Sequence, residues 1–403
     1  MTEMNVIALT EEVGQVTPEE LNRKQTLLGG KFGGTCYAAE GYATIRSQPE
    51  EKAFQRAERT AASGHHSVFQ HGMVTMEVHC PKIIAMLLNS IGVSNTSEKS
   101  ARYTAMQPET ELELELYGKW QGIFVRKIEE HYGNRLNRRD VEKLAGENAR
   151  YMISVFCATS MVYSLPFRNI FYVLDWAERM QENLRGMAGG FNKRLSKEIA
   201  GLIQSLSQVA GGRNFHDNKQ EYFRFMPVQA TGQYDDDNAE YYGDVYTAKF
   251  LSTFAQAAQE QRHRTTRVKI NFGGDHPAEY GFYVPVPLRG TKWEKEWLAD
   301  MEQVSSVYPQ GILVSVTEQG LFEDFALKCK ERMCGRAQLE IMQMTEELFK
   351  RFLAHKENLS KANRGRLEAM MENGSPCPRC GYRDFVCQEG CSWGKKEALT
   401  RLI

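Results

Sequence analysis

Four cysteines near the C-terminal end form the most specific chemical pattern in this sequence. Cys377 and Cys380 belong to a Cys-Pro-Arg-Cys-Gly turn, and Cys387 and Cys391 follow it. The glycine permits a tight backbone, so the turn aims two thiolates at one point, and the second pair can complete a tetrahedron of sulfur ligands. The spacing predicts a structural zinc site, because four ligands leave no open position. The same ribbon could also serve as a docking or nucleic-acid module.

A second pattern places a carboxylate, a hydroxyl and a guanidinium at two-residue intervals, in Glu98, Ser100 and Arg102, with Tyr103 beside them. In an extended or turn conformation all three can point to one side. Arg102 would then pair with a phosphate, Ser100 would donate a hydrogen bond, and Glu98 would accept one from a sugar hydroxyl or a base nitrogen. The pattern predicts a site for a phosphorylated polar ligand. A surface turn held by salt bridges is the alternative.

A third group of planar donors consists of Arg262, His263 and Arg264, at the end of an apolar helix that we predict over 246–262. These side chains could hold a pyrophosphate or the carbonyl side of an isoalloxazine ring. The alternative is a basic helix C-terminus that the helix dipole favours.

The fourth group lies on a long helix that we predict from about 321 to 360. Arg332, Arg336 and Glu340 follow each other at four-residue intervals, so on such a helix they share one face. This face could bind a ligand through its guanidinium groups, or it could be a solvated row of salt bridges.

The most apolar stretch runs from Tyr151 to Leu174 and carries a single charge, Arg168. It is long enough to span a bilayer, but Pro166 interrupts it and several of its side chains are polar. We therefore predict a buried pair of helices. In such surroundings Arg168 needs an anionic partner, either a carboxylate or a ligand phosphate.

The elements that must position these groups follow from the apolar patterns. The alternation of VTMEVHC predicts a strand within 64–90, and the run KIIAMLL predicts a helix directly after it. Charged residues over 108–150 indicate an exposed helical insertion, and a helical block extends to about residue 209. A second block repeats this plan, with a strand predicted over 282–287 and a polar hinge over 361–375.

The composition is that of an ordinary globular protein with two or three domains. The chain has 403 residues, of which 42% are hydrophobic, and its net charge is −1. That charge provides no field to attract nucleic acid or an anionic membrane. The N-terminus lacks the order of a secretion signal. We expect a cytoplasmic protein whose partner is a small molecule rather than a membrane or a nucleic acid.

The stretch from Gly64 to Thr104 resembles, without a gap, the conserved stretch of flavin-dependent thymidylate synthases. It begins with Gly-His, continues with Phe-x-His and a helix, and ends in the signature Glu-x-Ser-x-Arg-Tyr. The family's Arg-His-Arg, expected at 90–92, reads Ser-Ile-Gly here, whereas Arg-His-Arg is present at 262–264. From Pro309 to Ile341 the chain again resembles the family, ending in Arg-x-x-x-Arg-Ala-Gln-x-Glu-Ile. We infer two diverged copies of one fold, each keeping the half that the other lost.

The resemblance implies an α+β fold in which each copy places a helical layer over a small mixed sheet. The expected parts are an N-terminal copy, an acidic linker, a C-terminal copy and a zinc-ribbon tail, over 1–209, 210–245, 246–375 and 376–403. The family assembles as homotetramers, so a two-copy chain is expected to form a homodimer that mimics one. The tail also resembles the C-terminal zinc-binding tail of some ribonucleotide reductases.

In the family the nucleotide site lies between subunits, so the resemblance implies one complete composite site in a fused pair. Glu98, Ser100, Arg102 and Tyr103 would bind the substrate opposite Arg332 and Arg336, and Arg332 would act on the pyrimidine carbonyl edge. The second composite site would be free to decay. The residues implied for flavin are His65, Gln70, Arg168, Arg262, His263, Arg264 and Gln338.

The implied reaction is reductive methylation of dUMP to dTMP at C5. Methylenetetrahydrofolate supplies the carbon, reduced FAD the hydride, and NADPH recharges the flavin. No protein nucleophile is needed, in agreement with a sequence that places no cysteine or serine in a convincing nucleophile setting. Two alternatives remain: a nucleotide-binding protein that has lost flavin chemistry, and a zinc-ribbon adaptor whose duplicated body is only a scaffold.

Overall fold

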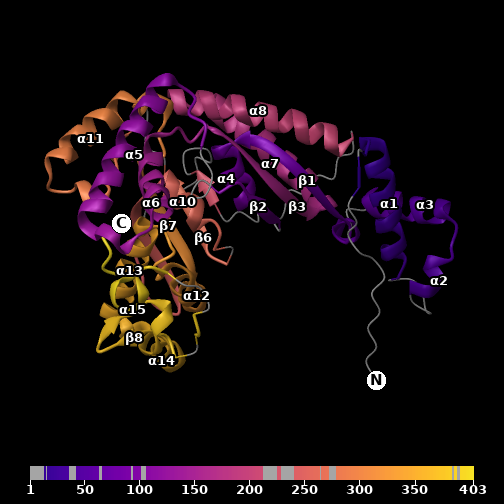
Figure 1. Cartoon of the computed structure of the whole chain (residues 1–403). Coiled ribbons are helices and arrows are strands. Elements are labelled where there is room, and N and C mark those ends of the chain that lie inside the picture. Colours follow the sequence, from indigo (N-terminus) through magenta and orange to yellow (C-terminus); the bar gives the residue numbers. More distant parts are fainter. Residues whose placement is uncertain are drawn as a thin grey trace.

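The fold is α+β, with two small sheets covered by helices. The computed structural model describes residues 13–14, 16–35, 42–62, 66–91, 94–100, 106–211, 225–227, 240–263, 265–271, 278–383, 385–387 and 391–403. These residues form an arch: three N-terminal helices lie at one end, the second sheet and the C-terminal helices lie at the other, and the first sheet with its helices joins them (Figure 1).

The first sheet has the order β1-β3-β2 and is antiparallel throughout. Its strands are β1 (Met73–Pro81), β2 (Asn95–Glu98) and β3 (Ala158–Pro166). β1 confirms the strand that the alternating pattern predicts, and α4 (Lys82–Ser90) confirms the helix after it. Every residue of α4 is buried, because the helix lies inside the largest apolar cluster.

The apolar stretch 151–174 is not the predicted pair of helices. It contains strand β3 and the beginning of α7 (Phe167–Arg185). Along β3, buried and exposed side chains alternate, which is the period of a half-buried strand. Pro166 ends the strand and caps α7, as its fixed φ and missing N–H allow. The prediction was wrong because the overall apolar content hid this alternation. α8 (Gly190–Ala210) packs against α7 within the same cluster.

The N-terminal arm consists of three helices and a short 3-10 helix. They are α1 (Pro18–Gly34), α2 (Tyr42–Arg46), α3 (Glu50–Ala62) and η2 (His66–Gln70). α1 and α3 approach closely, since a Cβ at Gly30 would lie 2.0 Å from the carbonyl oxygen of Ala53. The arm is attached to the bridge of the arch by the Asn22 side chain, which donates a hydrogen bond to Ala210 O at 3.0 Å.

The second sheet has the order β4-β6-β7-β5. Its strands are β4 (Phe225–Pro227), β5 (Val245–Thr253), β6 (Arg267–Asn271) and β7 (Leu313–Leu321). The helix predicted over 246–262 is therefore wrong in its first half, which is β5, and correct in α10 (Phe254–Glu260). Thr253 separates the two elements, because its hydroxyl accepts the Gln256 N–H at 3.0 Å as a helix cap. The predicted linker 210–245 also contributes β4, which pairs with β6.

The strand predicted over 282–287 is also absent from the described part. Only Phe282 pairs, in an isolated bridge to Ile312, and a 3-10 turn, η5 (Val286–Leu288), follows. Pro285 and Pro287 have no N–H to donate to a neighbouring strand, which explains why pairing stops.

The helix predicted from 321 to 360 is interrupted. α12 (Phe322–Arg332) and α13 (Leu339–Ala354) are separated by a connector of turns, and Gln338 caps α13. Arg332, Arg336 and Glu340 consequently do not share one helical face. The four-residue spacing of these residues could not reveal the break. The connector contains Gly335, and the Trp393 ring packs so closely against this glycine that a side chain would not fit there.

The predicted helical insertion is a hairpin of α5 (Glu111–Tyr132) and α6 (Arg138–Ala149), joined by η3 (Gly133–Arg135). It is only partly exposed. Trp120 of α5 packs edge-on against Trp297 of α11 (Lys292–Gln303), with ring centroids 4.9 Å apart. The remaining elements after α13 are η7 (Lys356–Asn358), α14 (Lys361–Ala369), β8 (Met371–Glu372), β9 (Ser375–Pro376), η8 (Arg379–Gly381) and α15 (Gly394–Glu397).

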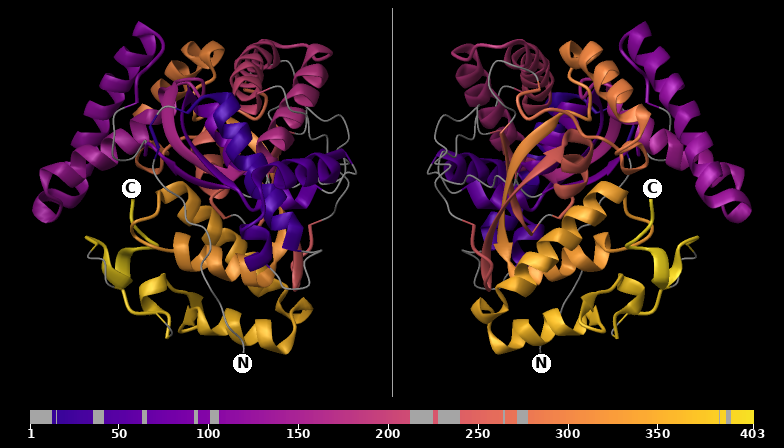
Figure 2. Two further views of the ribbon diagram at one scale, coloured as in Figure 1. Left: turned by 90° about the vertical axis from the view of Figure 1, so that its right-hand side faces the viewer. Right: turned by 90° about the vertical axis from the view of Figure 1, so that its left-hand side faces the viewer.

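The two sheets share one topology. When the short edge strand β4 is set aside, each sheet has a nine-residue strand that runs directly into a helix, and its last strand along the chain lies between the other two, in the orders β1-β3-β2 and β5-β7-β6. The halves meet where Ser154 and Pro309, each just before its sheet's central strand, form an antiparallel bridge. In both views of Figure 2 the strands of the two sheets lie side by side in the central part of the molecule. None of the helices in the described ranges is long and apolar enough to cross a membrane.

A buried ion cluster stabilises the second half. The Lys328 ammonium on α12 lies 2.8 Å from carboxylate oxygens of both Glu260 and Glu318, and all three side chains are fully buried. The Tyr246 hydroxyl donates to Glu318 at 2.7 Å. Burial raises the pKa of Glu260, even though the Lys328 charge opposes the shift.

Replacing this lysine should strongly destabilise the protein. Lys328→Met leaves two buried carboxylates without a cation, which costs about 3–5 kcal/mol in the free energy of unfolding. Urea titration measures the change. Lys350→Met is the control, because Lys350 makes an exposed i,i+4 pair with Glu346 that contributes less than about 0.5 kcal/mol. If Lys328→Met lowers the free energy of unfolding by less than about 1 kcal/mol, the ion cluster does not stabilise the fold to this extent.

Candidate functional site

A small cavity of about 40 Å³ lies at the junction of the two halves. Lys82, Ser100 and Arg150 line it from the first half, and Ala255, Ala258, Gln259, Arg262, Gln310 and Arg332 line it from the second. α4, which begins with Lys82, and α10, which carries Ala255, Ala258 and Gln259, lie near the middle of Figure 1. Four of the lining side chains are cationic and none is a carboxylate, so the cavity suits an anionic or strongly polar group.

Lys82 and Ser100 reach the cavity from the edge of the first sheet. Lys82 is the first residue of α4, and its N–H donates to Cys157 O at 2.8 Å, which fixes the beginning of the helix. Its ammonium lies 2.5 Å from the Glu98 carboxylate. That carboxylate is only 2% exposed and also accepts a hydrogen bond from Asn89 at 3.4 Å. Glu98 therefore fixes the position of Lys82 and does not itself line the cavity. From the sequence we had expected Glu98 to contact the ligand.

Arg150 and Gln259 present unused polar atoms. Arg150 is 5% exposed and Gln259 is 8% exposed. Each donates to Gln338 Oε1, Arg150 through Nη2 and Gln259 through Nε2. The Arg150 Nε–H and Gln259 Oε1 have no hydrogen-bond partner within the described part of the chain. Buried groups of this kind normally have partners, so the wall of the cavity contains one unsatisfied donor and one unsatisfied acceptor.

Arg332 is oriented by His263. Arg332 is the last residue of α12, and its Nε–H donates to His263 Nε2 at 2.7 Å while its Nη2 donates to Gln259 O at 3.3 Å. Burial, and then the Arg332 charge, lower the pKa of His263 to about 2. The imidazole is therefore neutral at physiological pH and can accept the arginine N–H. His263 therefore holds Arg332 through a hydrogen bond. From the sequence we predicted a flavin-binding role for His263, and this contact was not part of that prediction.

A buried hydrogen-bond hub beside the cavity joins the two halves. Gln338 donates to Tyr151 Oη at 2.5 Å, in addition to accepting from the two side chains of the cavity. Tyr151 in turn donates to Glu340 at 2.7 Å, and the Thr253 N–H donates to the same carboxylate at 3.2 Å. Burial raises the pKa of Glu340 to about 7, although the hydrogen bonds from Tyr151 and Thr253 lower it.

The structure separates several residues that we had expected to act together. Gln70 and Arg168 lie at the end of β3 opposite the cavity, since the Phe167 N–H bonds to Gly72 O there. Arg336 lines a different cavity, with Asp140 and Trp393 among its neighbours. It does not face Ser100 as predicted, because the break after α12 turns it away. Four predicted site residues lie outside the described ranges: His65, Arg102, Tyr103 and Arg264.

The four predicted sulfur ligands are not assembled around a metal position. Within the described ranges no group of three or more His, Cys, Asp or Glu side chains could hold a metal ion. Cys377 is buried and its thiol donates to Met370 O at 3.4 Å, while Cys387 is exposed. Burial and the nearby thiols of Cys387 and Cys391 raise the pKa of Cys380, which favours its protonated form.

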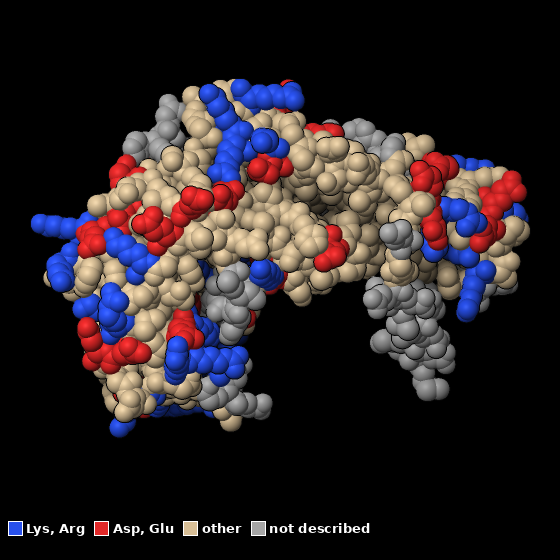
Figure 3. Space-filling view, turned by 45° about the horizontal axis from the view of Figure 1, so that its top comes forward, with Lys and Arg blue, Asp and Glu red and all other residues tan. Residues whose placement is uncertain are grey.

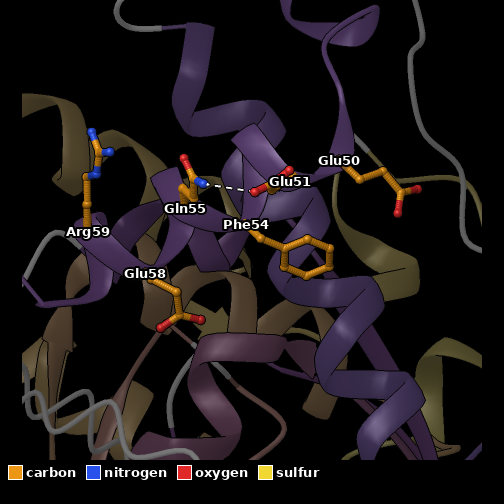
Figure 4. A pocket seen from close by; sticks show the side chains of 6 residues that line it. All are labelled: Glu50, Glu51, Phe54, Gln55, Glu58 and Arg59. Atoms are coloured by element: carbon orange, nitrogen blue, oxygen red, sulfur yellow. Dashed lines mark hydrogen bonds between the residues drawn. The ribbon is translucent and has the colours of Figure 1, made fainter.

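A further cavity lies on the outer face of α3 and has different chemistry. Glu50, Glu51 and Glu58 line it with Phe54, Gln55 and Arg59, and Gln55 bonds to Glu51 at 3.3 Å (Figure 4). Three carboxylates against one guanidinium disfavour a phosphate. This cavity is therefore not a second candidate for the same ligand.

Sequence reasoning found Ser100, Arg262 and Arg332 but missed Lys82, Gln259 and Gln310 as lining residues. Only tertiary pairing brings these together: the Gln310 N–H donates to Ile153 O, and this contact aligns the segments that lead into the two central strands. One usable signal was present, since a lysine that opens an otherwise apolar buried helix must have an anionic partner or a function.

Comparison with known families gives a match for part of the chain. Residues 30–199 match the family model described as thymidylate synthase complementing protein. This segment, which contains β1, α4, β2, β3, all of α7 and the first part of α8, is therefore the thymidylate synthase-like part of the chain. No curated protein matches the chain. The match includes Lys82, Ser100 and Arg150, the part of the cavity that the first half supplies.

The buried Glu340 makes the stability of the protein depend on pH. In the folded state its pKa is about 7, against an ordinary value of 4.5 in the unfolded chain, so the folded state holds the proton more tightly. The contribution of Glu340 to the free energy of unfolding is then largest below pH 4.5 and falls as the pH rises to about 7. The difference is on the order of 3 kcal/mol.

Glu340→Gln should remove this decline, because an amide does not titrate. Denaturant titrations of both proteins at several pH values between 4.5 and 7 measure the effect as a difference, which cancels the contribution of other groups. Equal pH dependence in the two proteins would contradict the assignment.

Proposed function

We propose that the protein is a flavin-dependent methyltransferase that acts at C5 of a pyrimidine nucleotide, converting dUMP to dTMP with methylenetetrahydrofolate and NADPH. One observation carries the proposal. Ser100, from the Glu-x-Ser-x-Arg-Tyr signature of the first half, and Arg332, from the Arg-Ala-Gln segment of the second, line the same cavity. This pairing supports the composite nucleotide site that the family resemblance implies.

The charges of the cavity support a nucleotide monophosphate. Lys82, Arg150, Arg262 and Arg332 surround it; Glu98 pairs with Lys82, and the Glu331 carboxylate lies 3.8 Å from Arg332. Ser100 adds a hydroxyl donor. Guanidinium groups bind phosphate oxygens in a bidentate manner, and partial burial strengthens these contacts relative to water.

The unsatisfied atoms in the cavity wall match the hydrogen-bonding functions of a uracil ring, which would reach them once the cavity widens. The imide edge of uracil alternates carbonyl acceptors with the N3–H donor. The Arg150 Nε–H can donate to a carbonyl, and Gln259 Oε1 can accept the N3–H. Arg332, held by neutral His263, is then available to stabilise the negative charge that spreads to the carbonyl oxygens when C5 becomes nucleophilic.

The two halves are not equivalent, and this supports one site per chain. Lys82 is the first residue of α4, and Phe254 is the first residue of α10 in the matching position of the second half. Phe254 stacks on Phe191, which also packs against Tyr308 with ring centroids 5.1 Å apart. Aromatic rings thus occupy the second position, as expected for a duplicate site that has decayed.

The flavin residues do not surround one cavity within a single chain. Arg262 lines the nucleotide cavity, whereas Gln70 and Arg168 lie at the far end of β3. A nine-residue strand is about 27 Å long, so the described residues of one chain do not fit a flavin. When bound, FAD would supply the hydride.

We therefore propose a homodimer, in which Arg262 of one chain and Gln70 and Arg168 of the other form the flavin site. Near Gln70 and Arg168, Met73 is 40% exposed, and Val162 on the neighbouring strand is 45% exposed. Charged side chains gather toward the two ends of the molecule and leave a broad face between them with few charges (Figure 3). A low density of charge is typical of the central part of protein interfaces.

Nucleotide binding tests the site directly. Arg332→Gln should raise the Kd for dUMP at least tenfold and abolish dTMP formation, because it removes a charged contact from a partly buried cavity. Calorimetry and product analysis measure the two effects. Arg366→Gln is the control, since Arg366 makes an exposed pair with Glu323 at 2.8 Å and should leave both quantities unchanged. Wild-type affinity in Arg332→Gln would contradict the site.

Complementation tests the shared flavin site. Arg168→Ala and Arg262→Ala should each abolish FAD uptake in a homodimer. In a purified heterodimer of the two variants, one site carries both changes and the other carries neither, so about half of the wild-type flavin absorbance should return. A heterodimer that stays colourless, or a wild-type protein that sediments as a monomer, would contradict the shared site. If dUMP binds but FAD never does, the protein is a nucleotide-binding member without flavin chemistry.

A further inference from the structure

A five-residue connector, Met333–Ala337, links the lining residue Arg332 to Gln338, which binds two lining side chains from behind the cavity wall. It begins directly after Arg332, which lines the cavity, and it ends at Gln338, the acceptor for Arg150 and Gln259. Inside the connector the Ala337 N–H donates to Cys334 O at 3.0 Å. It is a turn without the regular bonding of a helix, so its position depends on what packs against it.

The C-terminal tail packs against the connector at three points. The Arg379 N–H donates to Met333 O at 2.8 Å, and Arg401 Nη2 donates to Ala337 O at 2.6 Å. Between them, the Trp393 ring lies so close to Gly335 that a Cβ on the glycine would meet Cδ1 at 2.6 Å. Both ends and the middle of the connector are therefore held by one segment.

The same tail is attached to the first half of the protein. Arg135 Nη2 donates to Ser392 O at 2.9 Å, and the Leu402 N–H donates to the Tyr132 hydroxyl at 2.8 Å. The Trp393 ring packs against Tyr132 with centroids 4.9 Å apart. The tail thus spans from the α5–α6 hairpin to the connector, as its course near the C-terminus in Figure 2 shows.

Arg401 is the most constrained residue in this contact. It is 5% exposed, and burial lowers its pKa to about 10. Besides Ala337 it contacts Met342 Sδ at 2.9 Å on α13, and it also donates to Ala398 O. Burying a guanidinium is costly unless its donors are satisfied, so these contacts determine the local geometry rather than follow from it.

We propose that the tail, residues 376–403, is a strap that sets the positions of Arg332 and Gln338, with Arg401 as its principal positioning residue. Only the effect on nucleotide affinity rests on the proposed function. The strap gives the tail a role that requires no metal and touches no ligand.

The test compares Arg401→Gln with the wild-type full-length protein by hydrogen exchange, without nucleotide, and by calorimetry with dUMP. Exchange in peptides that cover 333–342 should rise at least tenfold in Arg401→Gln, and the Kd for dUMP should rise at least tenfold. Arg364→Gln is the matched control, because Arg364 donates to a backbone carbonyl in the same half, Leu359 O at 3.4 Å. It should change neither quantity.

A second variant guards against misfolding of the first. Gly335→Ala introduces the Cβ that meets Trp393, so it should loosen the same contact from the connector side and raise the same exchange. Exchange at 333–342 that equals the wild-type value in both variants overturns the strap. If exchange rises but the wild-type protein binds no dUMP, the strap stands and the proposed function fails.

Discussion

The buried side chain of Gln338 is the contact on which the rest of the site depends. It accepts from Arg150 of the first half and from Gln259 of the second, and donates to Tyr151, so one amide fixes both walls of the cavity. Removing one partner leaves a buried polar group unsatisfied, at a cost of about 1–3 kcal/mol. Because the bonds are shared, a change on either wall is transmitted to the other.

The asymmetry of the halves follows from the cost of buried charge. A cavity with several cations is stable only when an anion or its solvent can enter, because unpaired buried charges are expensive. The first position keeps Lys82 and faces Arg332, the eleventh residue of α12. The matching position has Phe254, and the eleventh residue of α7 is the fully buried Ala177. A duplicate site that binds nothing is more stable when it is filled with apolar side chains.

The sequence predicted the fold class and the parts of the site that depend on local signals. β1, α4 and the pairing of Ser100 with Arg332 were within reach, because alternation, apolar runs and short motifs are local properties. The break after α12 was not, since it depends on Trp393 packing against Gly335. Lys82 and Gln259 were missed for the same reason: they become neighbours only when the segments around Ser154 and Pro309 pair. Cysteine spacing predicted a zinc site, and this stays a prediction, since the described residues contain no group of three or more potential ligands placed to hold a metal ion.

The central claim is that the two halves build one nucleotide site per chain. Calorimetric titration of the purified full-length protein with dUMP counts these sites directly. Our account predicts a stoichiometry of one nucleotide per chain. Two equal sites per chain, or no binding at all, would contradict it.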